Sequence, residues 1–251
     1  MDNSSVGVLL LAVRSIAVGL GAVSTVDIEA AITTLQQVAI AYGAGDVAQG
    51  KGRDRPTPED VVAAMMALER GRRGERRELA LEQVLGSWRL IFVTGTKKTR
   101  KKAGKAIGAG RYLPGVPNIT IRYNASGSAE SSDDAVPDGA ADGAADGAAD
   151  IATNTGRAIN RVKLGAIALT VTGPIEAIAG RQTLAFDFTQ WSVAVGSWVI
   201  YRGEIGDGAA SDATFTERPL KDRPFFNYFW TSEAAIAARG KGGGLALWVK
   251  A

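Results

Sequence analysis

From Trp88 onward the chain carries short strand-like segments separated by turn-forming residues. In Trp88-Arg89-Leu90-Ile91-Phe92-Val93-Thr94 the bulky apolar residues fall at alternate positions, which is typical of a half-buried strand. The further candidates are 118–123, 158–172, 183–188, 191–202 and Leu245–Lys250. Because no helical patterns alternate with these segments, the sequence predicts an antiparallel barrel or sandwich, mainly β, that opens at 86–88 and closes at its last strand.

The region before Gly86 has helical patterns instead. Apolar residues recur at helical spacing over 27–42, with Ser24 or Thr25 available as a cap. A second helix is expected to begin at Pro58, since Thr57 suits the N-cap and Asp60 the third helical position, and to end at Gly71. A shorter helix is expected over 75–85. The region 27–85 therefore predicts N-terminal α-helices packed on one end or edge of the barrel.

Two further segments differ in composition from their surroundings. Residues 126–156 include G-A-A-D three times among Ser, Asp and Ala. Such a segment cannot bury enough apolar surface to offset the entropy of ordering, so it predicts a disordered insertion within one domain spanning 86–251. The strands on its two sides are expected to share a sheet. Residues 1–26 are apolar but borderline for spanning a bilayer, and are interpreted as a targeting remnant or a helix.

The chain contains no histidine and no cysteine. This composition excludes imidazole acids and bases, thiol nucleophiles, disulfides and the usual zinc sites. We therefore expect no catalytic residues, no metal ion and no cofactor. The competing hypothesis of a carboxylate enzyme has only Asp187, Glu204 and Glu233 near strand ends, and their spacing suggests no site. Residues 45–51 resemble a phosphate-binding loop, but Gly52 follows where Ser or Thr is required and a helix precedes it.

A basic run lies in the loop that follows the first strand. Its cations are Lys97, Lys98, Arg100, Lys101, Lys102 and Lys105. No aromatic stacking platform accompanies them, and the acidic stretch 133–150 would repel a polyanion, so nucleic acid is not an expected partner. The run is interpreted as a loop that faces anionic lipid headgroups, at about 1 kcal/mol per basic residue. The alternative is a plain solvated loop.

The Gly86-Ser87-Trp88 motif places an indole at the start of the first barrel strand. We expect Trp88 to plug the closed floor of a calyx-type barrel. Arg239 comes just before a glycine-rich turn and the final strand, which would place its guanidinium over that indole as a cation–π partner. The plainer alternative is that Trp88 is simply a core residue.

Several of these residues together resemble a known family. The run V-L-G-S-W-R-L-I-F at 84–92 resembles the opening of the plastid lipid-associated proteins, also called plastid fibrillins. Y-F-W at 228–230, A-R-G-K-G-G at 238–243 and the strand Leu245–Lys250 are similar to the family's closing motif. One departure is at Ser232-Glu233, where family members often carry Asp. If that acid selects the ligand, Glu233 replaces it only in part.

The resemblance implies a lipocalin-like barrel that binds or carries an isoprenoid-type lipid. It also implies peripheral association with thylakoids or lipid globules of plastids, or their cyanobacterial equivalent. Candidate cavity residues on alternate strand positions are Leu90, Phe92, Phe186, Phe188, Trp191 and Trp198, with Glu233 near the ligand. The alternative is a scaffold protein with a filled barrel that contacts membranes or a protein partner. Small inward residues such as Ala166, Ala168 and Gly196 would favour a cavity, and large residues meeting at the centre would favour the scaffold.

Overall fold

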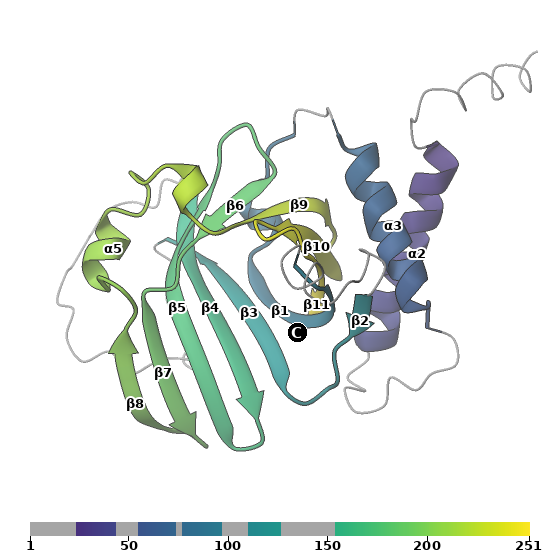
Figure 1. Cartoon of the computed structure of the whole chain (residues 1–251). Coiled ribbons are helices and arrows are strands. Elements are labelled where there is room, and N and C mark those ends of the chain that lie inside the picture. Colours follow the sequence, from purple (N-terminus) through teal and green to yellow (C-terminus); the bar gives the residue numbers. More distant parts are fainter. Residues whose placement is uncertain (1–23, 44–54, 74–76, 97–109, 127–153) are drawn as a thin grey trace, which may run out of the picture.

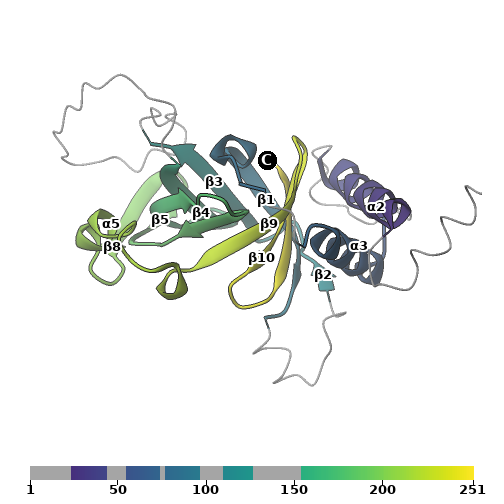
Figure 2. The same cartoon turned by 90° about the horizontal axis from the view of Figure 1, so that it is seen from above.

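The computed structural model describes residues 24–43, 55–73, 77–96, 110–126 and 154–251. Within these residues eight antiparallel strands close into a β-barrel, and the N-terminal helices pack on its outside (Figures 1 and 2). The expected fold class, mainly β with a lipocalin-like antiparallel barrel and N-terminal helices, is confirmed. The described helices include none that is both long enough and apolar enough to span a bilayer.

The strands fall into two groups, those that form the barrel ring and those outside it. The barrel strands are β1 (Gly86–Thr94), β3 (Asn118–Ala125), β4 (Thr155–Leu164), β5 (Ile167–Ala177), β6 (Thr183–Phe186), β9 (Phe225–Thr231), β10 (Ala235–Gly240) and β11 (Leu245–Lys250). The strands outside the ring are β2 (Gly110–Tyr112), β7 (Gln190–Val195) and β8 (Trp198–Glu204). The helices are α2 (Thr25–Gly43), α3 (Pro58–Gly71) and α5 (Ala209–Ala213), with 3-10 turns η2 (Leu81–Gln83) and η3 (Leu220–Asp222).

The first and last barrel strands pair with each other, as the sequence predicts. β1 lies antiparallel to β11, with Trp88 opposite Lys250. The ring runs β1, β11, β10, β9, β6, β5, β4 and β3, and the pairing of β4 with β5 completes it. Closure leaves no free sheet edge within the ring, which is the usual way in which an antiparallel sheet protects its backbone groups.

Two segments predicted as single strands are hairpins. The segment 158–172 folds back between β4 and β5, and 191–202 folds back between β7 and β8. The turns begin at Gly165 and Gly196, whose φ angles of 60° and 62° suit a glycine in a tight hairpin turn. Three strands, β2, β9 and β10, are missing from the prediction. Of the helix expected over 75–85, the described residues contain only the short 3-10 turn η2.

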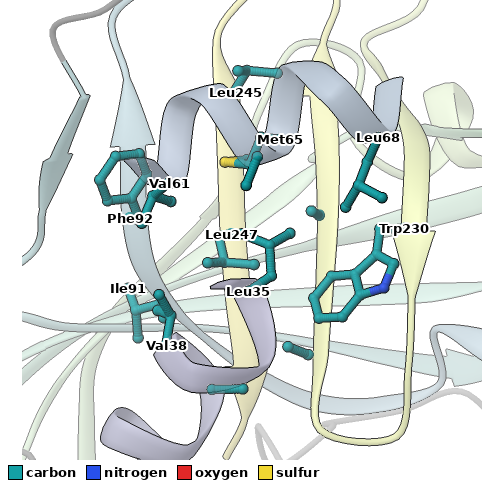
Figure 3. Close-up of a cluster of buried hydrophobic side chains, with 14 of the residues drawn as sticks. Leu35, Val38, Val61, Met65, Leu68, Ile91, Phe92, Trp230, Leu245 and Leu247 are labelled. Atoms are coloured by element: carbon teal, nitrogen blue, oxygen red, sulfur yellow. The ribbon is translucent and has the colours of Figure 1, made fainter. Parts of the chain in front are cut away.

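Helices α2 and α3 cover the outer face of the barrel at β1, β9, β10 and β11. Between helices and sheet lies a core of buried apolar side chains (Figure 3). Leu35 and Val38 from α2 and Met65 from α3 are fully buried there. The helix start predicted at Pro58 is confirmed by a capping box, in which the Thr57 side chain accepts from the Asp60 backbone and Asp60 accepts from the Thr57 backbone.

The sheet branches at Gly173. On one side of this glycine, β5 residues 167–172 pair with β7, and on the other side residues 175–177 pair with β6. The chain that joins β6 to β7 crosses directly above, where a Cβ on Gly173 would lie 2.3 Å from the Asp187 carbonyl oxygen. Because of this branch, the β7–β8 hairpin lies outside the ring. Strands β4, β5, β7 and β8 therefore form an open sheet that extends beyond the barrel (Figure 1).

The strands on either side of the 126–156 insertion are neighbours in one sheet. β3 and β4 pair over their whole length, from Asn118 opposite Lys163 to Ala125 opposite Gly156. The strands on its two sides therefore share a sheet, as the sequence led us to expect. Its expected disorder, the membrane-facing role of the 97–105 basic run, the 45–51 loop and nearly all of the 1–26 segment concern residues outside the described ranges.

Candidate functional site

The centre of the barrel is occupied by large aromatic side chains. Trp88, Tyr123, Tyr228 and Trp248 belong to one interior cluster and are each at most 4% exposed. The Trp88 indole donates a hydrogen bond to the Val84 carbonyl at 2.6 Å. Of the small residues considered, Ala166 and Gly196 are exposed in the hairpin turns, and alternation places Ala168 on the face of β5 that points away from the interior. The described centre of the barrel is therefore filled by its own side chains.

Two tyrosine hydroxyls meet inside this apolar cluster. The Tyr123 and Tyr228 hydroxyls are hydrogen-bonded to each other at 3.0 Å across the interior. Burial raises the pKa of Tyr123 above its ordinary value of 10, and burial together with the neighbouring Tyr123 raises the pKa of Tyr228. Both phenols are therefore held protonated, as polar groups satisfied within a largely apolar core.

Alkaline unfolding should depend on this tyrosine pair. Because both pKa values are raised by folding, their contribution to stability is complete below about pH 10 and is lost as the pH rises above that value. The loss is up to about 1.4 kcal/mol per pH unit for each phenol. The combined Tyr123→Phe and Tyr228→Phe variant should show a shallower decline in the free energy of unfolding, measured by urea titration across this range. A decline as steep as that of the wild type would contradict the assignment.

The expected pairing of Trp88 with Arg239 is wrong. Trp88 faces the barrel interior, and its cationic neighbour is Lys250, whose Nζ lies 4.4 Å from the ring centroid. Arg239 points outward, where its guanidinium donates to both carboxylate oxygens of Glu69 on α3 at 2.5 and 2.6 Å and to the Gly243 carbonyl. Strand alternation explains the error, because the two side chains lie on opposite faces of the barrel wall. Arg239 ties α3 to the barrel instead.

The predicted cavity residues divide among different surroundings. Leu90, Phe186 and Phe188 pack against the interior cluster, and the Phe186 ring stacks on Phe226 with centroids 4.9 Å apart. Phe92, also proposed for the cavity, is buried under the helices instead. A register shift between Leu90 and Phe92 interrupts the alternation and turns Phe92 outward.

The other three candidates lie away from the filled centre. Trp191 is half-buried on β7. It borders a depression of about 230 Å³, but lining residues such as Thr170 and Ser192 belong to the opposite face of the sheet. Trp198 is 78% exposed next to the β7–β8 turn, so it does not line an enclosed cavity. Glu233 is exposed in the turn between β9 and β10. These positions do not form one site with Leu90, Phe186 and Phe188.

The three carboxylates considered for an enzyme have separate environments. Asp187 forms an ion pair with Arg218 at 2.5 Å, at the end of the barrel where β9 begins. Glu204 ends β8 and lies opposite Gln190. Glu233 follows the other end of β9. The structure thus places Glu233 about one strand length from Asp187.

The interior face of the barrel continues onto the open sheet as an apolar surface. Register and alternation place on it Ile119, Val162, Leu164, Ile167, Leu169, Val171, Trp191, Val193, Val195, Trp198 and Tyr201. Leu169 on this surface is 43% exposed, whereas Ile175 on the same face of β5 is 1% exposed inside the ring. Sequence reasoning missed this surface because it read 158–172 and 191–202 as single strands.

One polar side chain interrupts the apolar surface. Asn160 lies on it between Ile121 of β3 and Val171 of β5, where the barrel interior meets the open sheet. Its Oδ1 is buried and has no hydrogen-bond partner among the described residues. Because an amide oxygen accepts hydrogen bonds, this atom is a ready partner for a ligand hydroxyl or amide N–H. The arrangement can therefore hold an apolar molecule with one polar group.

The comparisons with known proteins do not assign this chain to a family. No protein-family model matches the chain, and a search of curated proteins found no match.

Proposed function

We propose that this protein binds a single lipid-like molecule without catalysing a reaction. The observation that carries the proposal is the apolar face that runs from the barrel interior onto the open sheet, with Asn160 at the junction. Exposed apolar surface of this extent in a single chain commonly marks a binding site. Because Trp88, Tyr123, Tyr228 and Trp248 fill the centre, the ligand would lie over Leu169, Val171 and Trp191 instead of inside a deep calyx.

The ligand class follows from the chemistry of this surface. Aliphatic and aromatic side chains favour an acyl or isoprenoid chain, and burying one Leu-sized contact contributes about 2 kcal/mol. The unpartnered Asn160 Oδ1 favours a single polar group, such as the hydroxyl of a prenyl alcohol. The resemblance to plastid fibrillins supports an isoprenoid ligand and a peripheral location at thylakoid or lipid-globule surfaces.

Lipid extraction and fluorescence titration test the proposal. Mass spectrometry of an organic extract of the purified full chain should detect one co-purifying lipid class. A prenyl quinone should quench tryptophan fluorescence saturably. Leu169→Arg, at a half-exposed position, should weaken this binding by about tenfold, because it places a charge on the apolar surface. Thr170→Arg is the matched control, since it places the same side chain on the opposite face of β5.

The outcomes separate this proposal from its alternative. An extract without lipid, together with no saturable quenching, would overturn it. Equal weakening by Leu169→Arg and Thr170→Arg would also contradict the proposed surface. Either result would favour a scaffold protein with a filled barrel, a function supported by the four buried aromatic side chains at its centre.

A further inference from the structure

We infer that the end of the open sheet is a docking surface for an anionic lipid membrane. This hairpin end is formed by Leu164 and Ile167 around the β4–β5 turn, Val195 and Trp198 around the β7–β8 turn, and Val116 in the loop before β3. The inference does not depend on a ligand bound to the barrel.

The two turns form one continuous tip. The Gly196 backbone N–H donates to the Ala166 carbonyl at 2.7 Å, which joins the turns directly. Ile167 lies opposite both Leu164 and Val195, and Val195 lies opposite Trp198. The four apolar side chains therefore form a row on one face of the sheet, and Figure 1 shows the two turns side by side at the lower edge.

The row is unusually exposed for its composition. Trp198 is 78% exposed, Leu164 57%, Ile167 52% and Val195 44%. Among the described residues, the large exposed apolar side chains outside the β2–β3 loop and the 164–205 segment are Val26 and Ile40. Exposed apolar surface is thus concentrated on the part of the sheet that projects away from α2 and α3 (Figure 1). Tryptophan at such a tip suits the interfacial layer of a bilayer, where an indole is favoured.

The charged residues near the tip indicate which kind of partner it would bind. Lys163 precedes Leu164, and Arg161 and Arg202 lie farther back on the same two hairpins. The sequence has no Asp or Glu in 110–125, 156–175 or 188–203, the segments that supply this end of the sheet. An anionic membrane would attract these cations at about 1 kcal/mol each near the surface. A second copy docked by the same end would instead bring like charges together.

Vesicle binding by the full chain tests the docking surface. Flotation should show binding to vesicles of equimolar phosphatidylcholine and phosphatidylglycerol, and weaker binding to phosphatidylcholine alone. Trp198→Ser should lower the partition coefficient for the mixed vesicles by about tenfold. Ile40→Ser is the matched control, because it removes a side chain that is 74% exposed on α2. Circular dichroism should show both variants folded, since each substitution changes an exposed residue.

Fluorescence then reports whether the tip itself enters the bilayer. Trp198 is the most exposed of the five tryptophans, so brominated lipids should quench its emission on binding. Trp198→Phe should retain vesicle binding but lose most of that quenching. Absence of vesicle binding, or equal loss in Trp198→Ser and Ile40→Ser, would overturn the inference. Conversion of a dimer to a monomer by Trp198→Ser, with no vesicle binding, would assign the tip to a second copy. Quinone binding by the unaltered protein in solution is a separate readout, so failure of the proposed function is distinguishable.

Discussion

Replacement of Trp88 by alanine is expected to lower the free energy of unfolding by about 3–5 kcal/mol. The indole is 1% exposed at the centre of the interior cluster, and its truncation removes the hydrogen bond to the Val84 carbonyl. A loss of this size is a large fraction of the stability of a typical domain, about 5–15 kcal/mol. Urea denaturation followed by circular dichroism would measure it. A loss below about 1 kcal/mol would contradict the filled interior.

Double-mutant cycles identify the cation that interacts with this indole. Trp88→Leu combined with Lys250→Ala should show a coupling energy of about 0.5–1 kcal/mol, because the ammonium lies over the ring. Trp88→Leu combined with Arg239→Ala should be additive, since Arg239 binds Glu69 on the other face of the wall. Strong coupling with Arg239 would restore the pairing that the sequence suggested.

Gly173→Ala should destabilise the protein by about 3 kcal/mol. A Cβ at this position would lie 2.3 Å from the Asp187 carbonyl oxygen and 3.0 Å from the Phe188 Cα, and both are backbone atoms that a rotamer change cannot move. The substitution should therefore open the branch where β5 passes from β7 to β6. Thermal and urea unfolding would measure the loss.

Gly240→Ala provides the matched control for this branch. Gly240 also lies in a barrel strand, but its added Cβ would have ordinary contacts, the nearest being 3.5 Å to the Phe226 ring. The expected change is within about 0.5 kcal/mol. Equal destabilisation by the two substitutions would show that the close approach above Gly173 is not what requires the glycine.

Sequence patterns correctly predicted the elements whose formation depends on interactions between neighbouring residues. The helix start at Pro58 followed from the chemistry of Thr57 and Asp60, because a capping box lies within four consecutive residues. The alternation in β1 and in β11 likewise predicted two strands, and their pairing followed from the closure of an antiparallel barrel. In contrast, β10 was missed because Ala235-Ile236-Ala237-Ala238 shows neither a marked alternation nor a strong strand propensity. It is a strand because β9 and β11 pair with it on both sides.

The candidate site depended on information that no local pattern carries. Alternation from Trp88 placed Phe92 in the interior, but the register shift beside β11 turned it toward the helices. Arg239 was expected to contact Trp88, but its side chain lies on the outer face of β10 and binds Glu69 instead. The apolar surface through Leu169 and the tip at Trp198 exist because the sheet branches at Gly173. A branch is a relation among three strands, so it has no local sequence signature.

The sequence by itself determined the class of the fold, the presence of the N-terminal helices and the two strands that close the barrel. Each of these follows from residue periodicity and capping, which act over a few neighbouring residues. The tertiary structure alone decided that Trp88, Tyr123, Tyr228 and Trp248 fill the centre and that apolar residues emerge onto an open sheet. The physical reason is that burial depends on register and strand branching between segments far apart in the chain, where a shift of one residue moves a side chain to the opposite face.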